Sequence, residues 1–204
     1  MYDYFMTPEQ EKQWLQAIQE TAHIVDGRGM PIDPGILETV TAMRLLGAHT
    51  YMSCEGHMER GFGPYVACEA PNADADRKQL VALRKKNNLP DKDDPEIVQL
   101  SHKMNREERL ERLRILLYLN EFYETRNPPH LHRLSLENVG FLAMVLRCQG
   151  GAILVKDTGV ESAGYRREML ARHQQEMRDF TGFLKTKFCE ELGSTKIKGL
   201  GLCV

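Results

Sequence analysis

The sequence predicts an α+β fold, with a small, mostly antiparallel sheet packed with helices, a long helical arm and a long C-terminal helix. Three observations predict it. Apolar residues recur every three to four positions in segments near both ends and in the middle of the chain, as in amphipathic helices. Short alternating segments, typical of strands, lie between them. The length of 204 residues suits one domain, 1–204, with the helical arm 73–126 inside it.

Three of the expected helices begin with a capping residue followed by proline, at Thr7-Pro8, Asp33-Pro34 and Asp94-Pro95. Proline suits the first helical position because its missing N–H would have no intrahelical partner there. The second of these helices is expected to end at Gly47, and a final helix is expected over 162–192. Because 95–126 and 162–192 are longer than a small sheet needs, they predict a homo-oligomer formed through long helices.

The expected strands are 49–53, 65–69, 131–137, 143–148 and 152–156. Gly150-Gly151 is expected to form a hairpin turn between the last two strands. Alternation after the Pro128-Pro129 pair would place His130 and His132 on the same face of a strand.

The composition favours a cytoplasmic protein without a membrane partner. The net charge of −2 argues against a dedicated nucleic-acid-binding protein, since such proteins usually carry a basic excess. No apolar run approaches the roughly 20 residues that span a bilayer, and residues 1–5 lack the start of a signal peptide. The odd count of five cysteines predicts reduced thiols rather than a disulfide framework.

The expected working site is the loop Ser53-Cys54-Glu55-Gly56-His57, which directly follows a predicted strand. It gathers a hydroxyl, a thiol, a carboxylate, a glycine and an imidazole in one turn. Ten residues, 54–63, join two strands here, and long glycine-containing loops on rigid strands are often binding loops. The leading hypothesis is therefore the binding, with sequestration or modification, of a small nucleotide-type ligand.

Each residue type in this loop suits a ligand of that kind. Backbone N–H groups at a strand end form anion-binding nests, and Gly56 allows the backbone a close approach. Ser53, His57 and Arg60 supply hydrogen bonds to a phosphate or carboxylate, and Arg28 supplies a bidentate pair. The predicted ligand-binding residues are Arg28, Ser53, Cys54, Glu55, Gly56, His57 and Arg60.

Two alternatives use the same loop differently. Cys54 and His57 have the spacing of zinc ligands, and His130 with His132 could complete a tetrahedral site, which predicts a zinc-dependent enzyme or a zinc-stabilised fold. Cys54 beside Glu55 and His57 could also be a thiolate nucleophile. A third alternative, from a different class, is an interaction protein that works through its long helices.

Residues 26–69 resemble the start of the tRNA-wybutosine-synthesising methyltransferase family. That family carries D-x-S-x-K-G-x-I-D, a helix, and a strand ending in T-x-S-S-C-S-G-R. The counterparts are Asp26-x-Arg28-Gly29-x-x-Ile32-Asp33 and Thr50-Tyr-Met-Ser53-Cys54-Glu55-Gly56-His57. The stretch is also similar to uncharacterised bacterial and phage proteins with an S-C-E-G-H loop. The resemblance implies a bacterial or phage accessory protein whose loop faces a nucleotide-like ligand, such as S-adenosylmethionine or a phosphorylated nucleoside.

Overall fold

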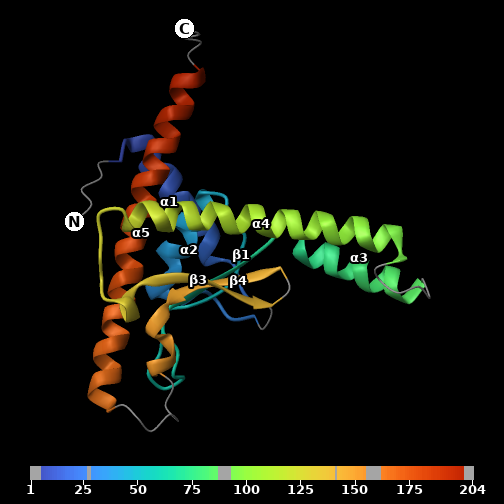
Figure 1. Cartoon of the computed structure of the whole chain (residues 1–204). Helices are drawn as coiled ribbons and strands as arrows, with labels where there is room; N and C mark the ends of the chain where they lie inside the picture. Colours follow the sequence, from blue (N-terminus) through green and yellow to red (C-terminus); the bar gives the residue numbers. More distant parts are fainter. Residues whose placement is uncertain (1–5, 27–28, 87–92, 141, 155–161, 200–204) are drawn as a thin grey trace.

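The computed structural model describes residues 6–26, 29–86, 93–140, 142–154 and 162–199, and the side chains of the last helix up to Leu192. It has the expected α+β fold, with helices gathered around a small antiparallel sheet (Figure 1). The elements in chain order are α1 (Pro8–Ala22), α2 (Pro34–Leu45), β1 (Thr50–Cys54), β2 (Tyr65–Glu69), α3 (Ala73–Lys86), α4 (Pro95–Tyr123), the 3₁₀ helix η2 (His130–His132), β3 (Leu134–Gly140), β4 (Ala143–Cys148), the 3₁₀ helix η3 (Gln149–Leu154) and α5 (Ala163–Gly199).

The four strands lie in the order β1-β2-β4-β3, and every neighbouring pair is antiparallel. Alternate residues of the strands face the helices, so that Val66 pairs with Leu146 and Leu146 with Leu136 in one buried row. Helices α1, α2, α4 and α5 contribute the other side of this core. The long helix α5 runs past the whole sheet, while α3 and the first half of α4 form an arm that projects from it (Figure 1).

The predicted helix starts are confirmed, and local side chains cap two of them, α1 and α4. Thr7 accepts the Gln10 N–H and Gln10 bonds back to the Thr7 N–H, which completes a capping box at α1. Asp94 accepts the N–H groups of Glu96 and Ile97 at the start of α4. Gly47 follows α2 with φ at 82°, as expected of a residue after a helix C-terminus.

Three predictions about the segment 130–156 are wrong. Residues 130–132 form the 3₁₀ helix η2, so His130 and His132 do not share a strand face; the proline pair before them offers no N–H for a ladder. Residues 152–154 belong to η3 rather than to a strand, and 155–156 lie outside the described residues. The third wrong prediction is the hairpin turn, because Gly150 and Gly151 lie within η3; an added Cβ at Gly150 would lie 2.6 Å from the Leu131 carbonyl oxygen.

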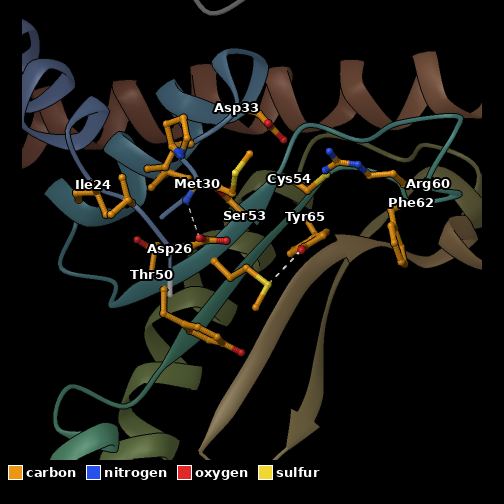
Figure 2. Close-up of a pocket in the computed structure, with 16 residues that line it drawn as sticks. Ile24, Asp26, Met30, Asp33, Thr50, Ser53, Cys54, Arg60, Phe62 and Tyr65 are labelled. Atoms are coloured by element: carbon orange, nitrogen blue, oxygen red, sulfur yellow. Dashed lines mark hydrogen bonds between the residues drawn. The ribbon is translucent and has the colours of Figure 1, made fainter. Parts of the chain in front are cut away.

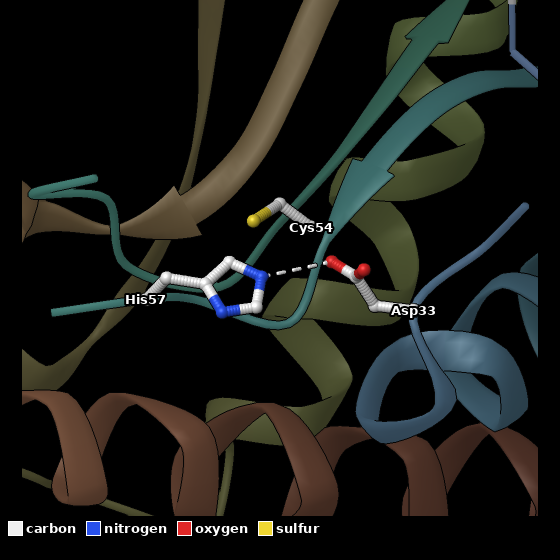
Figure 3. Close-up of side chains that lie close together, drawn as sticks. All are labelled: Asp33, Cys54 and His57. Atoms are coloured by element: carbon white, nitrogen blue, oxygen red, sulfur yellow. Dashed lines mark hydrogen bonds and ion pairs between the residues drawn. The ribbon is translucent and has the colours of Figure 1, made fainter. Parts of the chain in front are cut away.

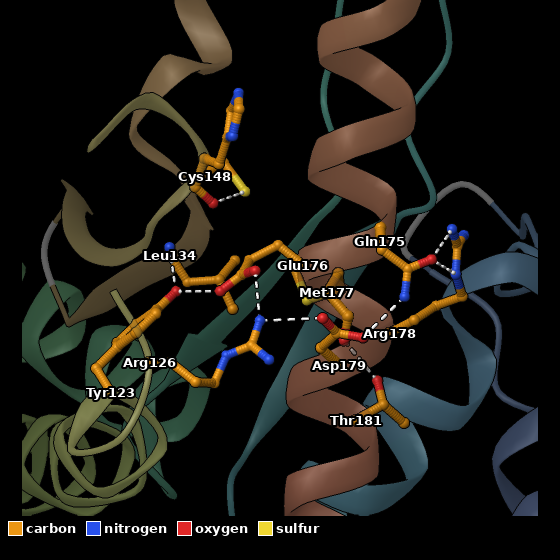
Figure 4. A network of polar contacts seen from close by, with 11 residues as sticks. Tyr123, Arg126, Leu134, Cys148, Gln175, Glu176, Met177, Arg178, Asp179 and Thr181 are labelled. Atoms are coloured by element: carbon orange, nitrogen blue, oxygen red, sulfur yellow. Dashed lines mark hydrogen bonds and ion pairs between the residues drawn. The ribbon is translucent and has the colours of Figure 1, made fainter. Parts of the chain in front are cut away.

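A partly buried polar network ties α4, α5 and β3 together (Figure 4). The Tyr123 hydroxyl accepts the Leu134 N–H at 2.7 Å and donates to Glu176 Oε1 at 2.9 Å. Arg126 bridges Glu176 at 2.8 Å and Asp179 at 3.0 Å. Since Glu176 is buried, this pairing is what makes its charge tolerable in the core.

Among the described residues, no helix combines the length and the apolar character needed to cross a membrane.

Candidate functional site

The loop after β1 folds back on itself. His57 and Phe62 exchange backbone hydrogen bonds, with the His57 N–H donating at 2.9 Å and the Phe62 N–H at 3.3 Å. Gly56 has φ at 90°, and an added Cβ there would lie 2.8 Å from Leu170 Cδ1 and 2.8 Å from Pro64 N. The position therefore requires glycine for both its conformation and its packing. From α5, Gln174 Nε2 donates to the Glu55 carbonyl at 3.1 Å and so fixes the loop to the helix.

Asp33 occupies the N-cap position of α2, yet its side chain makes no cap hydrogen bond. Instead, its Oδ2 accepts the Glu55 N–H at 3.2 Å and lies 3.2 Å from His57 Nε2. The Glu55 carboxylate takes over the capping, because its Oε2 accepts the Gly35 N–H at 2.7 Å. The Glu55 carboxylate thus accepts one of the free N–H groups at the N-terminus of α2 in place of Asp33, and the Asp33 carboxylate points toward the loop.

Asp33, Cys54 and His57 consequently form a compact cluster (Figure 3). One ligand atom of each lies within 4.8 Å of the other two. In tetrahedral zinc sites, bonds of about 2.0–2.3 Å place neighbouring ligand atoms roughly 3.3–3.8 Å apart. The cluster is therefore close to the size that a zinc ion requires, and its carboxylate, thiol and imidazole are all zinc ligand types.

The environment favours the ionised form of Asp33 and the neutral form of Cys54. Burial on its own raises the pKa of the Asp33 carboxyl, but the Glu55 N–H and His57 outweigh it and hold this pKa below its usual range. Burial raises the pKa of the Cys54 thiol, and the charge of the neighbouring Asp33 raises it further. The Gly56 N–H and Arg60 lower this pKa, but by less, so that the net shift is upward. Cys54 is thus a thiol in the metal-free protein, which disfavours a thiolate nucleophile.

A pocket opens beside the cluster, between the 24–33 segment and the edge strand β1 (Figure 2). Its volume is about 680 Å³, within the range of small-molecule sites. Asp33 and Cys54 lie in its wall, and among the described lining residues Arg60 is the one cationic side chain. Its other lining residues are Ile24, Val25, Asp26, Met30, Pro31, Ile32, Val40, Thr50, Tyr51, Met52, Ser53, Phe62 and Tyr65.

The predicted site residues divide into three groups. Ser53, Cys54 and Arg60 line the pocket, and His57 belongs to the adjoining cluster. Glu55 and Gly56 support the loop, the first through α2 and the second by close packing. Arg28 lies outside the described residues.

The two histidines expected to complete a zinc site do not join the cluster. Within the described ranges, the only group of three or more metal-capable side chains is Asp33, Cys54 and His57. The ring of His132 instead lies with its centroid 6.1 Å from that of His173. The third metal-capable side chain of the cluster is Asp33, whose sequence signal was that of a helix cap.

Comparison with protein-family models, curated proteins and solved structures finds no match for this chain.

Proposed function

We propose that Asp33, Cys54 and His57 bind a zinc ion and that the protein uses it on a small ligand held in the adjoining pocket. The observation that carries this proposal is the approach of the three ligand atoms to within 4.8 Å of one another beside that pocket. Catalytic zinc sites have three protein ligands and leave the fourth position to water or substrate. Zinc-bound water ionises near neutral pH, so the reaction class is metal-assisted hydrolysis.

The surroundings of the cluster support this assignment. Carboxylate ligands of metals are usually hydrogen-bonded by a second layer of groups, and the Glu55 N–H fills that role for Asp33. The Gly56 N–H donates to Cys54 Sγ at 3.4 Å. A metal would displace the thiol proton and stabilise the thiolate that burial disfavours. A thiolate ligand also suits the reducing cytoplasm.

The test is metal analysis of the purified protein after loading with zinc and removal of excess. We expect one zinc per chain, reduced to well under a tenth in Cys54→Ser, Asp33→Asn and His57→Gln. Cys189→Ser is the matched control, because Cys189 is a free thiol in α5 outside the cluster. In wild-type protein loaded with cobalt, a thiolate-to-cobalt charge-transfer band should appear, and it should vanish in Cys54→Ser. A folded wild-type protein that retains no metal would overturn the proposal.

A second candidate function is the binding of a small nucleotide-type ligand. The lining of the pocket favours it: Tyr51, Phe62 and Tyr65 offer aromatic faces for a base, and Arg60 offers a cation for a phosphate. The ligand could be sequestered or modified there.

A thermal-shift screen with nucleotides, cyclic nucleotides and S-adenosylmethionine, with and without zinc, tests this candidate. A ligand at 100 times its Kd stabilises the folded state by about 2.7 kcal/mol, which gives a clear shift. Arg60→Gln should reduce the shift, whereas Arg44→Gln, an exposed arginine of α2, should not. No shift with any of these compounds at millimolar concentration would contradict it.

A further inference from the structure

Helix α4 has two apolar faces, and in the part of the chain that the structure describes only one of them is covered. The covered face packs on α3 in its first half and on the core in its second half. The other face carries Leu110, Leu113 and Leu117, which are 55%, 55% and 67% exposed. At about 100° per residue, these three leucines fall within an arc of roughly 60°, on the side of the helix away from the covered face.

Charged residues continue this leucine face at both ends. Positions 106, 110, 113, 117, 120 and 124 keep the alternating spacing of three and four residues that is typical of a coiled-coil seam. Arg106 stands before the leucines, and Glu124 stands after them at the end of the helix; both side chains are exposed. The face is therefore basic at its N-terminal end, apolar in the middle and acidic at its C-terminal end.

We propose that the leucine face of α4 binds the same face of a second copy of this chain, with the two helices antiparallel. The reason is the order of the charges. An antiparallel pair places Arg106 opposite Glu124 of the second copy at both ends. In the same register Leu113 lies opposite Leu117 at the centre, and Leu110 lies opposite Asn120 on either side. A parallel pair would instead place arginine opposite arginine and glutamate opposite glutamate, which is repulsive.

This arrangement closes as a two-fold dimer, because both copies use the same face and each contact occurs twice across the axis. Other occupants fit the face less well. An acidic partner or an anionic membrane surface would favour basic residues along the whole face, whereas this one changes sign from end to end. The contact is centred on three leucines per copy, so the dimer should be weak and concentration-dependent.

Sedimentation equilibrium of the full chain, from about 5 to about 500 μM, tests the proposal. We expect the average mass to rise toward that of a dimer across this range. Leu113→Glu places charges at the centre of the seam and should weaken the dimer at least tenfold. Leu15→Glu is the matched control, because Leu15 is 52% exposed on α1 and should leave the association unchanged.

Charge reversal tests the direction of the helices. Arg106→Glu and Glu124→Arg should each weaken the dimer by about 5- to 20-fold, since two pairs per dimer become repulsive. The double variant R106E/E124R restores both pairs and should return the affinity to within about twofold of the wild type. A monomer at every concentration, a dimer that survives Leu113→Glu, or a double variant no better than the single ones would overturn the proposal. Thermal melting of each variant confirms folding, and all these residues are exposed.

Discussion

Gly56 is the residue on which the geometry of the site depends most, and Gly56→Ala should destabilise the protein by about 2–5 kcal/mol. The first part of this figure is conformational, because φ at 90° costs a non-glycine residue about 1–2 kcal/mol. The second part is steric. An alanine Cβ would lie 2.8 Å from Pro64 N and 3.0 Å from Gly63 C, which are backbone atoms, and such overpacking costs about 1–3 kcal/mol.

Gly29→Ala separates the two parts. Gly29 also has positive φ, 75°, but an added Cβ there meets nothing within 4 Å. It should therefore show the conformational cost alone, about 1–2 kcal/mol. Urea denaturation followed by circular dichroism measures both variants at equilibrium. If Gly56→Ala costs no more than Gly29→Ala, the close packing inferred for the loop is wrong.

Three further predictions concern the contacts around the site and core. Tyr123→Phe should cost about 1–3 kcal/mol in the same denaturation assay, because it leaves the Leu134 N–H and Glu176 without their hydroxyl partner; an unchanged midpoint would contradict this. Burial, with a smaller effect of His132, lowers the pKa of His173, so the unfolded chain binds a proton that the folded one does not. Stability should accordingly fall as pH drops below about 6.5, by at most about 1.4 kcal/mol per pH unit, and this part of the slope should be absent in His173→Gln. Glu55→Ala should lower zinc affinity by about 10- to 100-fold in a chelator competition, since Asp33 is then free to cap α2; Glu59→Ala, in the same loop, should not.

The sequence predicted those parts of the fold that depend on local chemistry. The proline-marked starts of α1, α2 and α4 and the strands β1, β2 and β4 lie where expected, because caps, turns and alternation act within a few residues. The segment 149–154 was mistaken for a turn and a strand. Gly150 is glycine because the Leu131 carbonyl and the buried ring of His173 lie against it, and both contacts come from distant parts of the chain.

Part of the candidate cluster could be expected from the sequence, again where the signal is local. The Ser53–His57 loop stands out by its density of polar residues, and Cys54 with His57 has ligand spacing. Asp33 was missed because an aspartate before a proline-started helix predicts a cap, and nothing local shows that Glu55 caps that helix instead. Conversely, His130 and His132 were included on spacing alone, which says nothing about distance in the fold.

The capping of α2 by Glu55 in place of Asp33 determines how a bound metal would affect the folding and stability of this protein. Because Glu55 caps α2 and Asp33 accepts the Glu55 N–H, the start of the helix and the loop are joined without an ion. Two of the three ligands, Asp33 and His57, are already 3.2 Å apart. A metal would therefore meet ligands that the fold has placed, unlike the ion in a zinc finger, where binding and folding are one event. Removing zinc should lower the melting temperature by the amount set by its affinity and concentration, without unfolding the chain.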